Sequence, residues 1–163
     1  MQQREPKEWL LAAYKAATKS TDLSTHNGAI IVAPNNVVIQ ACNEVPKRIK
    51  QKAERFQRPL KYDYTEHAER NAIYEAARLG ISVQGCTMYV PWYACSDCAR
   101  AIIQSGIAKI VGHKQMSDKT SDYWKESVKI GLEMLEEAGV KMELLDVEFN
   151  GPKVLFNGSW WTP

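Results

Sequence analysis

The alternation of strand-like and helix-like segments is the feature that most constrains the fold of this chain. Short apolar segments rich in β-branched residues predict strands at 29–33, 37–41, 86–90, 107–111 and 140–145. Amphipathic segments predict helices at 6–18, 67–79, 95–105 and 121–138. This order predicts one α/β domain over residues 1–163, in which helices lie on the faces of a central sheet.

Proline and glycine residues mark several boundaries of these segments. Pro6 suits the first turn of the first helix, and a glycine follows each of the other three helices. Residues 34–36 (Pro-Asn-Asn) predict a hairpin turn, and Thr65 is expected to cap the helix that follows it. A polar, basic loop is expected at about 44–64, whereas residues 150–163 receive no assignment.

Charge is distributed unevenly along the chain. The net charge is +2, but residues 47–61 contain seven basic residues and one acidic residue, so the remainder is acidic. Such a run suits a solvated surface or a rim that attracts phosphate. No apolar run approaches the roughly eighteen residues of a membrane span, and the N-terminal segment lacks the apolar core of a secretion signal. We therefore expect a cytoplasmic protein with no membrane partner.

His67, Cys95 and Cys98 form a candidate metal site. One imidazole and two thiolates suit Zn²⁺, which prefers tetrahedral nitrogen and sulfur ligands. Cys95 and Cys98 are three residues apart at the start of a predicted helix, so they share one face, and the helix N-terminus favours their ionised forms. Three protein ligands leave a fourth position open, as in catalytic zinc sites. Cys42 and Cys86 are expected to be small core residues.

Glu69 is the candidate general acid–base. It follows His67 by two residues, about 200° around an ideal helix, and this offset disfavours joint ligation. Zinc lowers the pKa of a bound water to about 7, and a neighbouring carboxylate can move that proton to a leaving amine. A His-x-Glu motif followed by Pro-Cys-x-x-Cys is the signature of zinc deaminases, in which the glutamate is not a ligand. This chain has each of these residues except the proline.

Each part of this pattern has a simpler interpretation when taken alone. His67 would suit a helix cap or a surface histidine, and the Cys95–Cys98 pair would suit a redox pair or half of a structural zinc site. A structural site needs a fourth ligand, and the candidates lack a second paired spacing: Cys42, Cys86, His26 and His113. The joint pattern therefore favours a catalytic zinc.

These motifs resemble those of the deoxycytidylate deaminases in the cytidine deaminase superfamily. The similar segments are STHNGAIIV at 24–32, HAERNAI at 67–73, CTMYV at 86–90 and ACSDCA at 94–99, within a core of about residues 8–112. The resemblance implies a three-layer α/β/α sandwich with a central mixed five-stranded sheet. It implies hydrolysis of the 4-amino group of a free deoxycytidine nucleotide, with release of ammonia. It also implies that Asn43 contacts the sugar, that the Ala68 backbone N–H helps to hold the base, and that subunits form a dimer or a hexamer.

Arg78 is the candidate phosphate ligand. It lies eleven residues after His67, about 20° from the same helical face, and long helical side chains lean toward the N-terminus. It also matches the position at which the resembling family places its phosphate-binding arginine. The alternative is a surface arginine or an ion pair at the edge of the core.

Two segments depart from the family pattern. The proline before the first cysteine is replaced by Ala94, with Pro91 three residues earlier, so the loop that contains Trp92 and Tyr93 is expected to differ. These rings suit stacking on a pyrimidine or anchoring in the core. The family's Gly-Tyr-Asn-Gly segment is replaced by residues 41–44 (Ala-Cys-Asn-Glu), which argues against triphosphate regulation. A 5-substituted cytosine, or a di- or triphosphate, stays open.

Three functional hypotheses follow. The first is a zinc-dependent deaminase of a free, dCMP-type nucleotide. The second is a deaminase that edits a base within RNA or DNA, with residues 47–61 on the backbone, although the acidic remainder of the chain argues against nucleic acid. The third is a non-catalytic zinc module, which would leave Glu69 without a purpose.

Overall fold

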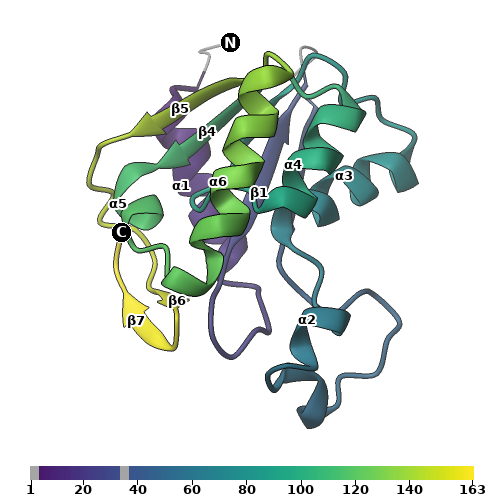
Figure 1. The fold of residues 1–163 in the computed structure, drawn as a ribbon, viewed down its shortest axis with the longest axis vertical. Coiled ribbons are helices and arrows are strands. Elements are labelled where there is room, and N and C mark those ends of the chain that lie inside the picture. The colour runs from purple at the N-terminus through teal and green to yellow at the C-terminus, as the bar shows by residue number, and fades with distance from the viewer. Residues whose placement is uncertain (1–3, 34–36) are drawn as a thin grey trace.

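The computed structural model describes residues 4–33 and 37–163, and its centre is a mixed five-stranded sheet (Figure 1). The strands are β1 (Gly28–Val32), β2 (Val38–Cys42), β3 (Thr87–Tyr89), β4 (Lys109–His113) and β5 (Lys141–Leu145), in the order β2-β1-β3-β4-β5. β1 is antiparallel to both of its neighbours, whereas β3, β4 and β5 run parallel. The mixed five-stranded sheet that the family resemblance implies is therefore confirmed.

Helices cover both faces of the sheet and complete three layers. α1 (Pro6–Ala17) lies on one face, and α3 (Ala68–Leu79), α4 (Ser96–Ser105) and α6 (Asp122–Glu137) lie on the other (Figure 1). Because successive strand side chains point to opposite faces, Ile30 packs in the cluster under α1 while Ile31 packs in the cluster under α3 and α4. Cys42 and Cys86 are buried, as expected for small core residues.

Gly28 sets the distance between α1 and the sheet. A Cβ atom at this position would lie 2.1 Å from the carbonyl oxygen of Ala13 and 2.6 Å from the amide nitrogen of Ala17. Ala13 and Ala17 are themselves fully buried. Small residues on both sides therefore let the helix backbone lie directly against β1.

The predicted cap at Thr65 is wrong. Thr65 ends the short helix α2 (Lys61–Tyr64), and His67 is the residue that precedes α3. Between them Glu66 pairs with Glu44 through two backbone hydrogen bonds, of 2.9 and 3.1 Å. This pairing keeps the chain extended up to His67, so the helix cannot begin earlier.

The start of one strand differs by two residues from the prediction, and the structure adds three elements after β4 that were not predicted. The strand expected at 107–111 begins at Lys109, because the Ile107 N–H still bonds to the Ile102 carbonyl and closes α4. The unassigned tail forms a hairpin of β6 (Val154–Phe156) and β7 (Ser159–Trp161), and a short helix α5 (Lys114–Asp118) follows β4. The predicted turn at 34–36 lies outside the described residues.

None of the helices in the described ranges is long and apolar enough to span a bilayer.

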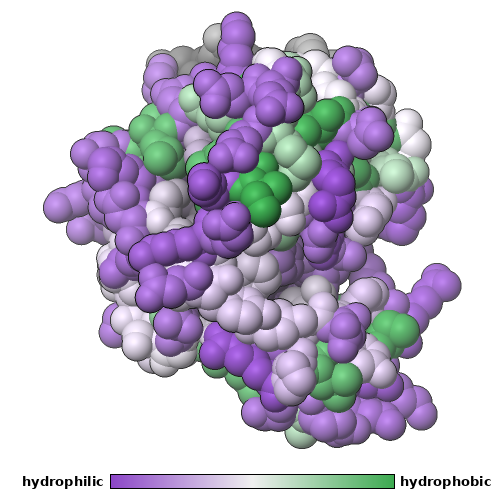
Figure 2. Space-filling model, viewed as in Figure 1, coloured by the Kyte–Doolittle hydropathy of each residue, from purple (hydrophilic) through white to green (hydrophobic). Residues whose placement is uncertain are grey.

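Residues 45–65, here called the basic lobe, project from the body of the protein (Figure 1). The expected loop contains a 3-10 turn, η1 (Ala53–Phe56), and α2. The Glu44–Glu66 pairing closes the base of the lobe. In the space-filling view the lobe stands out from the body, and hydrophilic side chains alternate there with a few hydrophobic ones (Figure 2).

Candidate metal centre and adjoining pocket

Two helix N-termini bring the three candidate ligands together. His67 directly precedes α3, Cys95 directly precedes α4, and Cys98 lies in the first turn of α4. His67 Nδ1 lies 3.5 Å from the Sγ atom of each cysteine. Arg70 holds the two helix starts together, because its guanidinium pairs with Glu66 and lies 3.4 Å from Asp97.

The spacing of these atoms fits a tetrahedral zinc. With typical Zn–N and Zn–S bond lengths, a tetrahedral ion places nitrogen and sulfur ligands about 3.6 Å apart. All three ligand atoms lie within 4.8 Å of one another. The donor set of one imidazole and two thiols is also that of zinc rather than of magnesium or calcium. His67, Cys95 and Cys98 can therefore hold a zinc ion.

The four alternative ligands considered for a structural zinc site lie elsewhere. In the part of the chain that the structure describes, no fourth histidine, cysteine or carboxylate joins the cluster. His113 bonds to the Tyr14 hydroxyl at 2.6 Å and to the Val147 carbonyl at 2.8 Å. His26 Nε2 lies 3.0 Å from the Asp22 carbonyl oxygen. The cluster thus has three protein ligands, as catalytic zinc sites do.

The two thiols have opposed ionisation behaviour. The hydrogen bond with Cys98, and to a lesser degree that with His67, lowers the pKa of Cys95 to about 4 against the effect of burial. The same hydrogen bond with Cys95, together with burial, raises the pKa of Cys98. Without a cation the pair therefore favours a single thiolate, and a divalent ion supplies the charge that stabilises the second.

Glu69 lies beside this cluster and is almost fully buried, with 2% of its surface exposed. Burial raises the pKa of its carboxyl to about 7. A group with such a pKa can both take up and release a proton near neutral pH, as general acid–base catalysis requires. Glu69 is not a member of the ligand cluster.

One pocket adjoins the metal cluster and contains about 660 Å³, counting space open to solvent. Of the residues predicted for the site, it is lined by Asn43, His67, Ala68, Glu69, Trp92, Tyr93 and Cys95. Cys98 is not among the lining residues and is fully buried. The structure therefore gathers most of the predicted residues around one cavity.

Asn43 braces the wall of this pocket. Its Oδ1 accepts a hydrogen bond of 2.8 Å from the Asn27 N–H, and its Nδ2 donates one of 2.7 Å to the Thr25 carbonyl. It thereby fixes the loop before β1 to the end of β2. Ala68 opens α3, where backbone N–H groups have no partner within the helix, and it lines the pocket.

The two aromatic residues of the 91–94 loop differ in their surroundings. Tyr93 is buried, and its hydroxyl donates to the Glu143 carbonyl at 2.7 Å, so it anchors the core. Trp92 donates through Nε1 to the Thr120 hydroxyl at 2.9 Å and packs edge-on against Trp124, with ring centroids 6.0 Å apart. Both rings line the pocket.

Arg78 is not brought to the pocket. Its side chain is 61% exposed and pairs with Glu75 on the surface of α3. The pocket opens at the N-terminus of α3, whereas Arg78 lies about three turns further along. Arg78 is thus part of a surface ion pair. Its predicted role in binding phosphate stays a prediction that this geometry does not support.

Sequence reasoning missed several residues of the pocket: Asp22, Arg58, Lys61, Tyr62 and Trp124. The Trp124 ring lies 5.6 Å from the His67 ring. Trp124 is in the first turn of α6, a helix that carries no motif, so only tertiary packing identifies it. The basic run at 47–61 was a usable signal for the two cationic residues, although it did not indicate which members of the run face the pocket.

Comparisons with known proteins agree with this geometry. A model of the cytidine and deoxycytidylate deaminase zinc-binding region matches residues 3–114. The chain belongs to this deaminase family. It is 36% identical over 129 residues to an uncharacterized deaminase in the luxG 3′ region of Aliivibrio fischeri, covering 79% of this chain and 85% of that protein.

One further relative and one solved structure provide additional comparisons. The chain is 42% identical over 95 residues to the deoxycytidylate deaminase of enterobacteria phage T4, covering 58% of this chain but only 42% of that protein. The dCMP deaminase of cyanophage S-TIM5 superposes with a TM-score of 0.68 at 22% identity, covering 89% of this chain and 100% of the other. At that identity the likeness supports the fold.

Proposed function

We propose that this chain is a zinc-dependent deaminase of a free deoxycytidine nucleotide of the dCMP type. The observation that carries the proposal is the cluster of His67, Cys95 and Cys98 beside the buried Glu69, at one pocket. Relatives named deoxycytidylate deaminase support the choice of substrate. A structure of the S-TIM5 enzyme in complex with dCMP and dUMP has the same fold, with a TM-score of 0.67.

The residues of the pocket divide the chemistry between them. His67, Cys95 and Cys98 would hold the zinc, which acts as a Lewis acid and activates water near neutral pH. The overall reaction adds water at C4 of the pyrimidine and expels the 4-amino group as ammonia. The Glu69 carboxylate accepts the proton of the attacking water and delivers it to the departing amino group. Its burial keeps bulk water from competing for that proton.

The base would lie against the aromatic side of the pocket. Trp92 and Trp124 present ring surfaces there, and flat apolar rings bind pyrimidines by stacking. The Ala68 N–H, at the positive end of α3, suits an acceptor group of the base. Asn43 keeps the neighbouring wall in place and is assigned to the sugar by family resemblance.

Residues 1–163 are proposed to act as one catalytic domain in the cytoplasm, within a homo-oligomer. Zinc, the nucleotide and further copies of the chain are then its partners. Nucleic acid is not, because the net positive charge is confined to residues 47–61 and the remainder of the chain carries a net negative charge.

A substrate panel tests the proposal. Zinc-loaded protein is assayed by ultraviolet absorbance with dCMP, dCTP, 5-methyl-dCMP, cytidine, adenosine and guanine. We expect dCMP to be deaminated with the highest kcat/KM. A lack of turnover with every cytosine nucleotide would rule the proposal out, and a preference for dCTP or 5-methyl-dCMP would reassign the substrate.

A further inference from the structure

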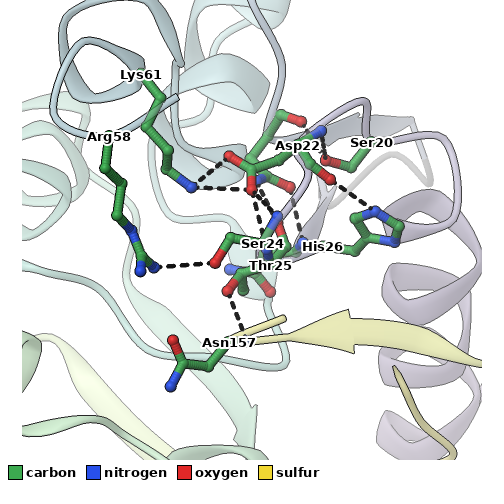
Figure 3. A network of polar contacts seen from close by, with 10 residues as sticks. Ser20, Asp22, Ser24, Thr25, His26, Arg58, Lys61 and Asn157 are labelled. Carbon is green, nitrogen blue, oxygen red and sulfur yellow. Dashed lines mark hydrogen bonds and ion pairs between the residues drawn. The ribbon is translucent and has the colours of Figure 1, made fainter. Parts of the chain in front are cut away.

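The charged groups of the pocket do not all neutralise one another. Lys61 Nζ lies 2.9 and 2.8 Å from the two carboxylate oxygens of Asp22. These side chains are only 9% and 4% exposed, so they form a buried ion pair whose charges cancel. Figure 3 shows Lys61 and Arg58 extending from the basic lobe toward the loop that contains Asp22 and Ser24.

Arg58 is the cation that this arrangement leaves uncompensated at the pocket. Its Nη2 donates to the Ser24 hydroxyl at 3.0 Å. Among the residues that the structure describes, no carboxylate lies within ion-pair distance of its guanidinium. A guanidinium has five N–H donors in a planar fork, so most of its donors remain available to a ligand.

The position of Arg58 is fixed by contacts on either side of the pocket. Three residues further along, Lys61 is anchored by Asp22. The next residue, Tyr62, stacks on Tyr123 of α6, with ring centroids 5.6 Å apart and an interplanar angle of 18°. The lobe is therefore tied both to the 20–26 loop and to α6, and it presents Arg58 between them.

The loop that faces Arg58 is rigid and offers one further donor. Asp22 Oδ1 accepts hydrogen bonds from the Ser24 and Thr25 N–H groups, at 2.7 and 2.9 Å. The Ser24 hydroxyl accepts its hydrogen bond from Arg58, so its own proton is free to be donated. Arg58 lines the pocket, and the planar fork of its guanidinium suits a pair of phosphate oxygens.

We propose that Arg58 binds the 5′-phosphate of the nucleotide and sets the preference for nucleoside monophosphates over nucleosides. Lys61 is a positioning residue that holds the lobe so that Arg58 faces the pocket. One uncompensated cation matches a single phosphate group better than a triphosphate. This inference rests on the function proposed above and assigns to Arg58 the role that sequence analysis gave to Arg78.

The test compares Arg58→Ala with Lys52→Ala. Lys52 lies on the same lobe, is exposed and does not line the pocket, so its replacement removes the same charge at a different place. Two quantities are measured for each zinc-loaded variant: kcat/KM for dCMP and deoxycytidine, and the Kd of dUMP and deoxyuridine by calorimetry.

Loss of charge-assisted hydrogen bonds to a phosphate predicts that Arg58→Ala weakens dUMP binding and lowers kcat/KM for dCMP by about 10- to 100-fold. Values for deoxycytidine and deoxyuridine should stay unchanged. Arg58→Lys should recover part of the loss, because it keeps the charge without the fork. Lys52→Ala should stay within about threefold of wild type, since exposed charges contribute little.

Unchanged dUMP affinity in Arg58→Ala would overturn the inference, and so would an equal loss in Lys52→Ala or an equal loss for the nucleosides. Failure of the proposed deaminase function would give a different result. If wild-type protein turned over no cytosine nucleotide but bound dUMP in a manner that depends on Arg58, the reaction would be wrong and the phosphate site would stand.

Discussion

Replacing Lys61 with methionine removes one half of the ion pair that ties the basic lobe to the body of the protein. The methionine keeps most of the side-chain volume, so the main change is a carboxylate at Asp22 without its cation. Both side chains of the pair are less than a tenth exposed, and solvent screening is therefore weak. Removing one partner of such a buried pair costs about 3–5 kcal/mol.

The structure places this variant at the lower end of that range. Asp22 retains two backbone hydrogen bonds, from Ser24 at 2.7 Å and from Thr25 at 2.9 Å, so its charge is not left bare. We expect a cost of about 3 kcal/mol. Water reaches Asp22 when the basic lobe separates from the body, so the cost destabilises only the state in which the lobe is packed against the body. The population of molecules with a detached lobe should therefore increase on the order of a hundredfold.

Limited trypsin digestion measures the detached population, since residues 47–58 contain several lysines and arginines. The matched control is Lys47→Met, which removes one lysine of the same lobe and breaks an ion pair with Glu75 in which Lys47 is 65% exposed. That exposed pair contributes about 1 kcal/mol or less. Equal cleavage rates in the two variants would refute the reasoning. The double variant Asp22→Asn, Lys61→Met should be cleaved more slowly than Lys61→Met, because it no longer buries an unpaired charge.

Three further predictions concern the metal centre and the pH dependence of stability. Glu69→Gln should lower turnover by about 10²- to 10⁴-fold with zinc content unchanged by elemental analysis, and surviving activity would contradict the assigned role. Chelation of zinc should lower the Tm of wild-type protein but leave Cys98→Ala unaffected, whereas equal shifts would show that these ligands do not hold the ion. Burial lowers the pKa of His113 below 6.5, so the unfolded state binds more protons and the free energy of unfolding should fall as the pH drops below about 6.5. His113→Gln should flatten this dependence, measured by urea unfolding in excess zinc, and an unchanged slope would exclude His113 as its source.

Local signals in the sequence were sufficient for most of the strands and for the candidate metal ligands. Strands β1 and β2 contain several β-branched residues. Glycines with positive φ end α3 and α4 at Gly80 and Gly106, where such residues are favoured. His67, Cys95 and Cys98 could be combined because each lies at a predicted helix start. These features depend on short-range geometry, which a sequence expresses directly.

Other parts depend on contacts between distant segments. Helical periodicity relates Arg78 to His67 by an angle around α3, but it does not reveal which end of the helix the pocket occupies. Arg58 and Trp124 reach the pocket only because the lobe and α6 pack beside it. Thr65 does not cap α3, because the next residue, Glu66, pairs with Glu44, more than twenty residues away in the chain. No local sequence pattern predicts such a pairing.

The two hydrogen bonds between Glu44 and Glu66 have a consequence for how this architecture can vary. They hold the two ends of the basic lobe side by side, immediately before the first metal ligand. Insertions, deletions or wholesale replacement of the intervening chain therefore need not shift β2 or α3. Replacement of the basic lobe can therefore change which ligand is preferred, while the residues of the metal centre and their chemistry stay the same.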